Sequence, residues 1–238
     1  SDAQDTRTMR ELSNQSKNQT SFRIHLENIH DAQMEPEDWT AIIRLVENGC
    51  KPVDKKFGDI LKEINLQNWS LTQDRYEQLI NIIKECPKIT ILNLTASLKS
   101  VPFDVIYTRL LGLVQLTELS IGENTEQDDF PGVSVNLDFG QSTLTNLTKL
   151  NLKENSITHI KGISKLVKLT HLNLSKNQTS SIKPLSALVN LTELDLGFNE
   201  IEELNGLENM VNLKVLDLES NNIENLKGLE DMINLTEL

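Results

Sequence analysis

The stretch LTELDLGFNEIEELNGLENMVN, from Leu191 to Asn212, decides the fold because the following LKVLDLESNNIENLKGLEDMIN repeats its pattern. Four contiguous units of 22 residues share this pattern, and they begin at Leu147, Leu169, Leu191 and Leu213. Apolar residues at positions 1, 4, 6, 11, 14, 17 and 20 and asparagine at position 9 fill 31 of 32 slots, Thr179 being the exception. A fixed period of this size predicts a solenoid that turns once per repeat.

The spacing within a repeat predicts its local structure. Positions 4 and 6, such as Leu194 and Leu196, are two residues apart and therefore share one face of a short strand, while positions 5 and 7 face solvent. Position 16 marks a turn and holds Gly162, Pro184, Gly206 and Gly228. The later apolar residues recur in steps of three, which suits a 3₁₀-like or irregular return segment.

Position 9 is expected to be buried, and it holds Asn155, Asn177, Asn199 and Asn221. An amide can both donate and accept hydrogen bonds, so it can satisfy the backbone groups left free where each strand turns. A single coil of 22 residues buries too little apolar surface to offset its ordering entropy, so stacking on neighbouring coils must supply the difference.

The motif L-x-x-L-x-L-x-x-N, as in LTELDLGFN and LKVLDLESN, resembles the leucine-rich-repeat family. The 22-residue form is similar to internalin-type repeats and to those of the leucine-rich-repeat regulatory subunit of protein phosphatase 1. This resemblance implies an α/β solenoid: a right-handed superhelix with a parallel β-sheet on the concave side and helices or 3₁₀ turns on the convex side.

The repeats upstream are longer. Strand signatures begin at Leu61, Ile89 and Leu116, so residues 61–146 form repeats of 27–31 residues with room for outer helices. One such helix is predicted in LTQDRYEQLINIIKECP, where Tyr76, Leu79, Ile80 and Ile83 share a face. A second lies in VPFDVIYTRLL, and an acidic loop, TEQDDFPG, is inserted before residue 146.

Residues 22–60 are interpreted as an N-terminal cap with a strand in FRIHL and a helix in EPEDWTAIIRLVENG that ends at Gly49. The inward face of this helix holds Trp39, Ile42, Ile43 and Val46. Residues 1–21 are polar and expected to be flexible. Residues 147–238 hold the 22-residue repeats, and the last repeat is truncated, so we expect the natural protein to continue past Leu238.

Composition narrows the possible partners and compartment. The formal net charge of −12 argues against nucleic acid or an anionic membrane as the main partner, and no apolar run is long enough to insert into a membrane. Cys50 and Cys86 are expected to be free thiols. Nine Asn-x-Ser/Thr sequons, some of them on predicted strands, favour a compartment without N-glycosylation, cytoplasmic or bacterial.

Catalytic motifs are missing from the sequence. It has no glycine-rich phosphate loop, no H-E-x-x-H and no cysteine pair at metal-ligand spacing. We therefore predict that the protein is not an enzyme and needs no cofactor or metal.

The predicted concave face, formed by positions 3, 5, 7 and 8, carries the candidate binding residues. His171 is expected one strand from Lys149 and one strand from Glu193, either as a charged trio that binds a ligand or as cross-strand charge pairs. Phe198 is a large apolar residue on the concave edge, suited to anchoring an interface or to packing on the next loop. The candidate partner-binding residues are Lys149, Asn151, Lys153, His171, Asn173, Lys176, Glu193, Asp195, Phe198, Asp217 and Glu219.

Charge is banded along the array. Residues 116–146 hold six acidic and no basic side chains, residues 147–190 hold seven lysines and one acid, and residues 191–238 hold twelve acids and two lysines. Opposite bands can fix the stacking order of the repeats or orient a partner of complementary pattern. The acidic last repeats favour a partner with a basic segment.

These observations predict a monomeric, non-enzymatic protein-binding module whose concave face grips a protein partner. One version is a bacterial protein, secreted and possibly delivered into a host cell, that interacts with the host or acts as an effector. An alternative is an intracellular scaffold similar to the phosphatase regulator, located in the cytoplasm. A third is the substrate-recognition arm of a larger enzyme that continues past residue 238. The sequence identifies neither the partner nor the organism.

Overall fold

The structure is a computed structural model of the chain. It describes residues 22–25, 36–50, 61–124, 135–230 and 232–238. The segment 1–21, predicted to be flexible, and the predicted acidic loop TEQDDFPG lie outside the described residues.

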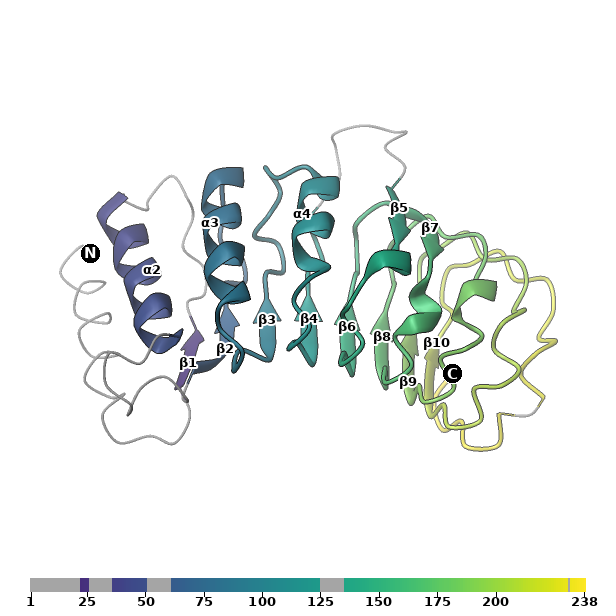
Figure 1. Cartoon of the computed structure of the whole chain (residues 1–238). Coiled ribbons are helices and arrows are strands. Elements are labelled where there is room, and N and C mark those ends of the chain that lie inside the picture. The colour runs from purple at the N-terminus through teal and green to yellow at the C-terminus, as the bar shows by residue number, and fades with distance from the viewer. Residues whose placement is uncertain (1–21, 26–35, 51–60, 125–134, 231) are drawn as a thin grey trace.

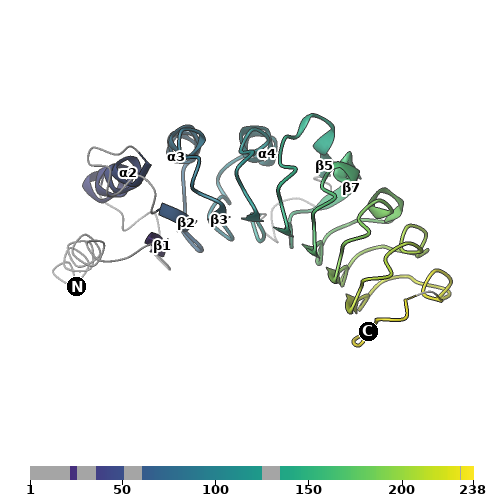
Figure 2. The ribbon, with the colours of Figure 1, turned by 60° about the horizontal axis from the view of Figure 1, so that its bottom comes forward.

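One parallel sheet of eight strands lines the inner side of an arc (Figure 2). Each strand pairs in register with the next one along the array, as expected for one strand per coil. The strands in spatial order are β1 (Phe22–His25), β2 (Leu61–Asn65), β3 (Ile91–Asn93), β4 (Glu118–Ser120), β6 (Lys149–Asn151), β8 (His171–Asn173), β9 (Glu193–Asp195) and β10 (Val215–Asp217). The predicted α/β solenoid is confirmed.

Helices cover the outer side of the N-terminal half (Figure 1). They are α2 (Pro36–Cys50), α3 (Gln73–Lys84) and α4 (Phe103–Leu110). Thr72 caps α3 by accepting a hydrogen bond from the Arg75 N–H, and the predicted apolar face of α3 is fully buried. The Tyr76 hydroxyl donates a 2.6 Å hydrogen bond to the Ile106 carbonyl on α4. The inward face of α2 is buried as predicted, although this helix runs one residue past Gly49.

The outer side of the C-terminal half carries shorter elements, as the steps of three predicted. They include three 3₁₀ turns, η3 (Phe139–Gln141), η4 (Ile163–Lys165) and η5 (Lys183–Leu185). A second, two-stranded parallel sheet of β5 (Val135–Asp138) and β7 (Ile157–Lys161) was not predicted. Gly162, which follows β7, adopts φ +66°, and an added Cβ there would lie 2.4 Å from the Gly140 nitrogen.

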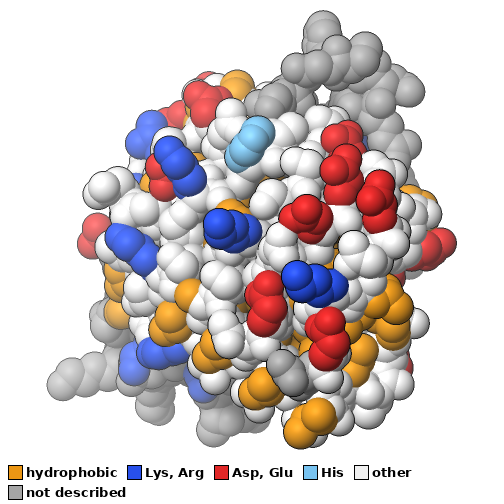
Figure 3. All heavy atoms as spheres, turned by 90° about the vertical axis from the view of Figure 1, so that its right-hand side faces the viewer, with side chains coloured by type: hydrophobic (Ala, Val, Ile, Leu, Met, Phe, Trp, Pro, Cys, Tyr) orange, Lys and Arg blue, Asp and Glu red, His pale blue; other side chains and the backbone are white. Residues whose placement is uncertain are grey.

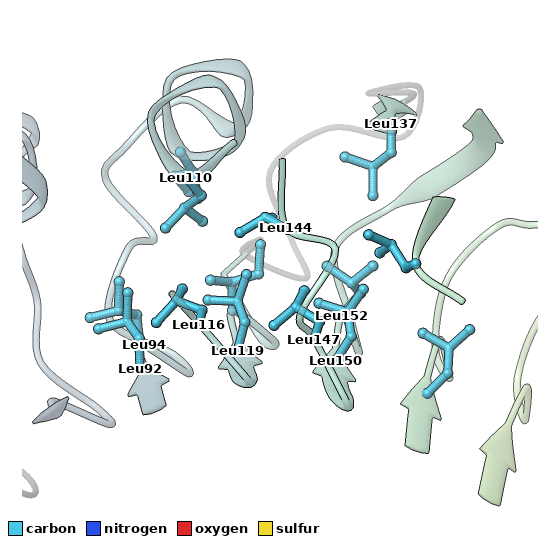
Figure 4. Packing of buried hydrophobic residues seen from close by; sticks show 14 of the residues in the cluster. Leu92, Leu94, Leu110, Leu116, Leu119, Leu137, Leu144, Leu147, Leu150 and Leu152 are labelled. Atoms are coloured by element: carbon cyan, nitrogen blue, oxygen red, sulfur yellow. The ribbon is translucent and has the colours of Figure 1, made fainter. Parts of the chain in front are cut away.

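Leucines from successive repeats stack behind the sheet to form one continuous core (Figure 4). Leu119, Leu150 and Leu152 on neighbouring coils are 4%, 2% and 1% exposed. No coil encloses its own core, so each depends on contacts with the coils on either side.

The position-9 asparagines make the predicted hydrogen bonds to the backbone and form a ladder beside this core. Asn177 is 7% exposed, and its Nδ2 donates to the carbonyls of Leu152 and Leu174 at 3.0 and 2.8 Å. Asn155 and Asn199 are also buried, whereas Asn221 in the last full repeat is half-buried. Thr179, the one departure from the repeat pattern, is 1% exposed, and its hydroxyl donates to the Ile157 carbonyl at 3.3 Å.

Cys86 is buried and disulfide-bonded, so the expectation that it is a free thiol is wrong. Cys86 follows α3, which contacts α2 in the outer layer. The sequence pattern placed these two helices on successive coils, but it did not show that Cys86 would be bonded. Among the described residues, no helix is both long and apolar enough to cross a bilayer.

Candidate functional site

An open hollow follows the concave face from Glu63 on β2 to Asp217 on β10. Short strands place positions 3 and 5 of every repeat on this hollow, because alternate residues of a strand face the same side. The curvature of the arc makes the sheet concave toward solvent (Figure 2). Most of the sequence-predicted binding residues therefore share one continuous surface.

The predicted neighbours at position 3 are confirmed by strand register, since Lys149 pairs with His171 and His171 pairs with Glu193. Their side chains form two separate pairs. The His171 Nε2 lies 3.3 Å from Glu193 Oε1, whereas Lys149 Nζ lies 3.3 Å from Glu118 Oε1 on the preceding strand. Of the two interpretations of the trio, this geometry supports the cross-strand charge pairs.

The position-5 residues have a structural role that the sequence interpretation missed. In Asn151, Asn173, Asp195 and Asp217, the Oδ1 atom accepts a hydrogen bond from the N–H two residues later, at 3.0, 2.9, 3.1 and 2.8 Å. These contacts are Asx turns that end each strand. The signal was present in the sequence, because this solvent-facing slot alternates only between Asn and Asp in the 22-residue repeats.

Two lysines at the end of the strands pair with acids of the preceding repeat. Lys153 Nζ lies 2.8 Å from Glu123 Oε1, and Lys176 Nζ lies 3.4 Å from Glu154 Oε2. The hydrogen bond with Glu123 is the main reason that the pKa of Lys153 is raised. Together with the Lys149–Glu118 pair, these contacts neutralise much of the basic band on the concave side.

The acids at the C-terminal end of the hollow are not neutralised in this way. Asp217 and Glu219 are exposed, and neither has a cationic partner among the residues that the structure describes. Both oxygens of Asp195 accept hydrogen bonds, from the Gly197 N–H and from Asn173 Nδ2. These donors are neutral, so Asp195 keeps its negative charge, and Asp217 and Glu219 add negative charge that is more exposed to solvent.

Phe198 stands beside these acids in an unfavourable conformation. It has φ +57°, as do its counterparts in neighbouring repeats within a few degrees, and its side chain is 48% exposed. The left-handed region is uncommon for bulky residues. The adjacent Gly197 lies close to the acids, since a Cβ added there would be only 3.2 Å from Asp217 Oδ1. An exposed aromatic ring thus borders an acidic depression.

No group of three or more His, Cys, Asp or Glu side chains in the described part of the chain is arranged to hold a metal ion. The concave groups that approach one another do so as ion pairs and Asx turns. The features of this surface that can bind a partner are its concave shape, its charged side chains and the ring of Phe198.

Family models place this architecture in a known class. A model described as leucine-rich repeats in two copies matches residues 145–187 and 167–209, and a single leucine-rich-repeat model matches residues 209–226. Residues 145–226 of the chain therefore consist of leucine-rich repeats. No curated protein matches it significantly.

Several solved structures are similar to this chain. Internalin C2 of Listeria monocytogenes has a TM-score of 0.61 and 26% identity, with 76% of this chain and 72% of that chain covered. A leucine-rich-repeat protein of Leptospira interrogans has a TM-score of 0.56 and 20% identity, with coverage of 91% and 59%. The functional domain of the Listeria internalin InlJ, which includes a cysteine ladder, has a TM-score of 0.51 and 21% identity, with coverage of 76% and 39%. The last two show a shared fold alone.

Proposed function

We propose that this protein is a non-enzymatic binding module whose concave face holds a protein partner with a basic segment. The similarity of this chain to internalin-type leucine-rich-repeat proteins supports a role in protein–protein interaction in general. The observation that carries the specific proposal is the pair of uncompensated acids, Asp217 and Glu219, beside the exposed ring of Phe198. A partner lysine or arginine there would gain both charge pairing and contact with the aromatic face.

The remaining candidate residues take supporting roles in this proposal. Lys149, His171 and Glu193 line the middle of the hollow and would contact the partner beyond its basic segment. Asn151, Asn173 and Asp195 hold the strand ends in place, so their substitution would affect binding mainly through the shape of the surface. Lys153 and Lys176, each paired with an acid of the preceding repeat, border the site.

The repeats themselves supply substitutions that respect the fold. Reversing Asp195 or Asp217 to lysine would remove the acceptor of an Asx turn. Asparagine keeps that acceptor, and it stands naturally in this slot in two neighbouring repeats. The test variant therefore combines Glu193→Lys, Asp195→Asn, Asp217→Asn and Glu219→Lys. Lysine fits both glutamate positions, because Lys149 occupies the slot of Glu193 and Lys153 the slot of Glu219 in an earlier repeat.

A control variant, Glu200→Lys, Glu202→Lys and Glu224→Lys, changes the net charge by the same amount at exposed positions after the asparagine ladder. Both variants and the parent are used to capture proteins from lysate for mass spectrometry. We expect a partner that the parent and the control retain and the concave variant loses. Equal capture by all three proteins would discard the concave acidic end as the binding site.

We also propose that the protein acts in an oxidising compartment, as a secreted or surface-exposed bacterial protein. Disulfide-bonded Cys86 supports this location, because stable disulfides are rare in the cytosol. Similarity to Listeria internalins supports it as well. The same disulfide weakens the rival interpretation as a cytoplasmic scaffold. Cell fractionation of the organism that produces this protein tests the proposal. Protein in the secreted or surface fraction would support it, and protein retained in the cytoplasm with reduced thiols would refute it.

A further inference from the structure

A row of exposed aliphatic side chains lies outside the concave site, two residues before the first apolar residue of each strand unit. The row recurs once per repeat, and hydrophobic side chains reach the surface along the lower margin of the C-terminal view (Figure 3). Its members, Val114, Val167, Val189, Val211 and Ile233, are 49%, 48%, 39%, 45% and 86% exposed. Thr145, also exposed, interrupts the row in the same slot. Aliphatic side chains aligned in this way form a ridge and differ from scattered apolar residues on a surface.

The ridge is held in fixed register by the asparagines that follow Val189, Val211 and Ile233. Asn190 Nδ2 donates to the Val167 carbonyl at 2.8 Å, and Asn212 Nδ2 donates to the Val189 carbonyl at 3.0 Å. Asn234 repeats this contact with Val211 at 2.8 Å. Neighbouring side chains of the ridge are therefore about 4.8 Å apart, which is the spacing of the strands.

A polar groove runs beside the ridge, and it is lined by threonine and asparagine together with Lys168 and Lys214. The threonine hydroxyls are already used: Thr170 donates to the Thr148 carbonyl and Thr192 donates to the Thr170 carbonyl, both at 3.0 Å. No acidic side chain lines this groove. The groups of this groove that can attract a charged ligand are therefore the ammonium groups of Lys168 and Lys214.

The charge of this surface is opposite to that of the whole chain. We call the two rows that flank the first apolar residue of each strand unit the leading edge. From residue 62 to residue 236, every charged residue of the leading edge is a lysine, namely Lys62, Lys88, Lys168 and Lys214. The net charge of the chain is −12. The leading edge therefore attracts a partner that the acidic concave end repels.

We propose that the ridge and the leading edge form a second docking surface, for an extended acidic segment of a partner protein. Lys168 and Lys214 precede β8 and β10, which are two strands apart, so the backbones of the two lysines are separated by about 10 Å across the sheet. A segment in the polyproline II conformation advances about 3.1 Å per residue with three residues per turn, so carboxylates three residues apart point to the same side and match this separation. Aliphatic side chains between and beside them would cover the valines of the ridge.

Neither Lys168 nor Lys214 is paired with a carboxylate of the described residues, so both charges can attract an acidic segment. Lys168 Nζ donates to the neutral amide oxygen of Asn146 at 2.7 Å, and Lys214 has no ionic partner in the described residues. The concave site and the leading edge would thus take segments of opposite charge. One partner could occupy both, or two partners could bind together.

Two substitution sets test this surface without disturbing the fold. The first is Val167→Thr, Val189→Thr and Val211→Thr, because Thr145 already occupies the same slot. The second is Lys168→Asn and Lys214→Thr, because asparagine and threonine fill the equivalent slots in the other 22-residue repeats. Both sets should melt within about 3 °C of the parent, as expected for exposed sites.

A phage-displayed library of random dodecapeptides is selected on the parent protein, and the enriched peptides are synthesised with a fluorescent label. We expect enrichment of two acidic residues three positions apart with aliphatic residues around them. A concave-face control variant carries Glu219→Lys and Phe198→Ser. Fluorescence anisotropy should show peptide binding weakened about tenfold or more in either leading-edge variant, and unchanged within about twofold in this control.

Three results would overturn the proposal. Enriched peptides without the acidic pair, or no enrichment at all, would remove the predicted ligand chemistry. Peptides whose affinity falls only in the Glu219→Lys, Phe198→Ser variant would place binding on the concave face. Sedimentation that shows self-association of the parent, lost in the threonine variant, would identify a second copy of this chain as the occupant of the ridge.

Discussion

Asn177 Oδ1 accepts a 3.1 Å hydrogen bond from the backbone N–H of Asn155, the residue in the same slot one repeat earlier. It also accepts from the Ile157 N–H at 2.9 Å. Each asparagine of the ladder thus connects its own coil to the one before it. The ladder supplies polar contacts between coils, in addition to the stacking of leucines, and makes the stability of each repeat depend on its neighbours.

Asn177→Ala should therefore destabilise the protein by about 3 kcal/mol or more, because it leaves several buried backbone groups without partners. Asn221→Ala should cost only about 1 kcal/mol, since Asn221 is half-buried and water can replace its contacts. Urea unfolding followed by circular dichroism measures both. Equal losses of unfolding free energy would contradict the account of the ladder.

Gly162→Ala should be strongly destabilising, by about 2–4 kcal/mol. An L-residue is strained at its φ of +66°, and the added Cβ would meet the Gly140 nitrogen at 2.4 Å. Gly112→Ala is the matched comparison, because no atom lies within 4 Å of the added Cβ there. The midpoint of thermal unfolding should fall for the first variant only. A melting temperature unchanged by Gly162→Ala would show that the turn after β7 tolerates other conformations.

Phe198→Asn should separate stability from binding. Asparagine tolerates the left-handed conformation better than phenylalanine, which offsets the loss of a half-exposed ring, so unfolding free energy should change by less than about 1 kcal/mol. Affinity for the concave partner should fall about tenfold or more. Calorimetric titration and thermal unfolding of the same samples measure the two effects. A large drop in stability with intact affinity would assign Phe198 to packing.

Reduction of the disulfide should weaken the N-terminal end of the array. Disulfides stabilise proteins by about 2–4 kcal/mol. We expect a phosphine reductant to lower the melting temperature of the parent and to leave that of Cys86→Ser unchanged. The reduced parent and the variant should then melt together. A parent that is insensitive to the reductant, with complete reduction confirmed by mass spectrometry, would show that the bond to Cys86 adds no stability.

The fold was predictable to the extent that one residue's environment repeats along the array. Leu194 and Leu196 have counterparts two residues apart in every 22-residue repeat, so their strand and their burial follow from the pattern. The helix α3 was visible because four apolar residues share one face. The sheet of β5 and β7 was not, because Ile157 and Ile160 fit a return segment of any conformation, and their pairing depends on Val135 and Leu137 in an irregular repeat.

The candidate site was predicted in position and less well in detail. Alternation along the strands placed His171 between Lys149 and Glu193, but ion-pair choice depends on side-chain reach, and Lys149 turns to Glu118 instead. Asp195 faces the hollow as expected, yet its oxygens are used within the protein. The bond of Cys86 was not predicted, because a helical pattern does not fix which side chains at the helix ends come within bonding distance.

The most direct test of concave binding uses a photo-crosslinker. Benzoylphenylalanine replaces Glu219 in one sample and Glu202 in another, since both side chains are exposed and only the first borders the concave acidic depression. After capture of the partner and irradiation, the account predicts a covalent adduct from position 219, mapped by mass spectrometry to a basic segment of the partner, and none from position 202. An adduct from position 202 alone would contradict it.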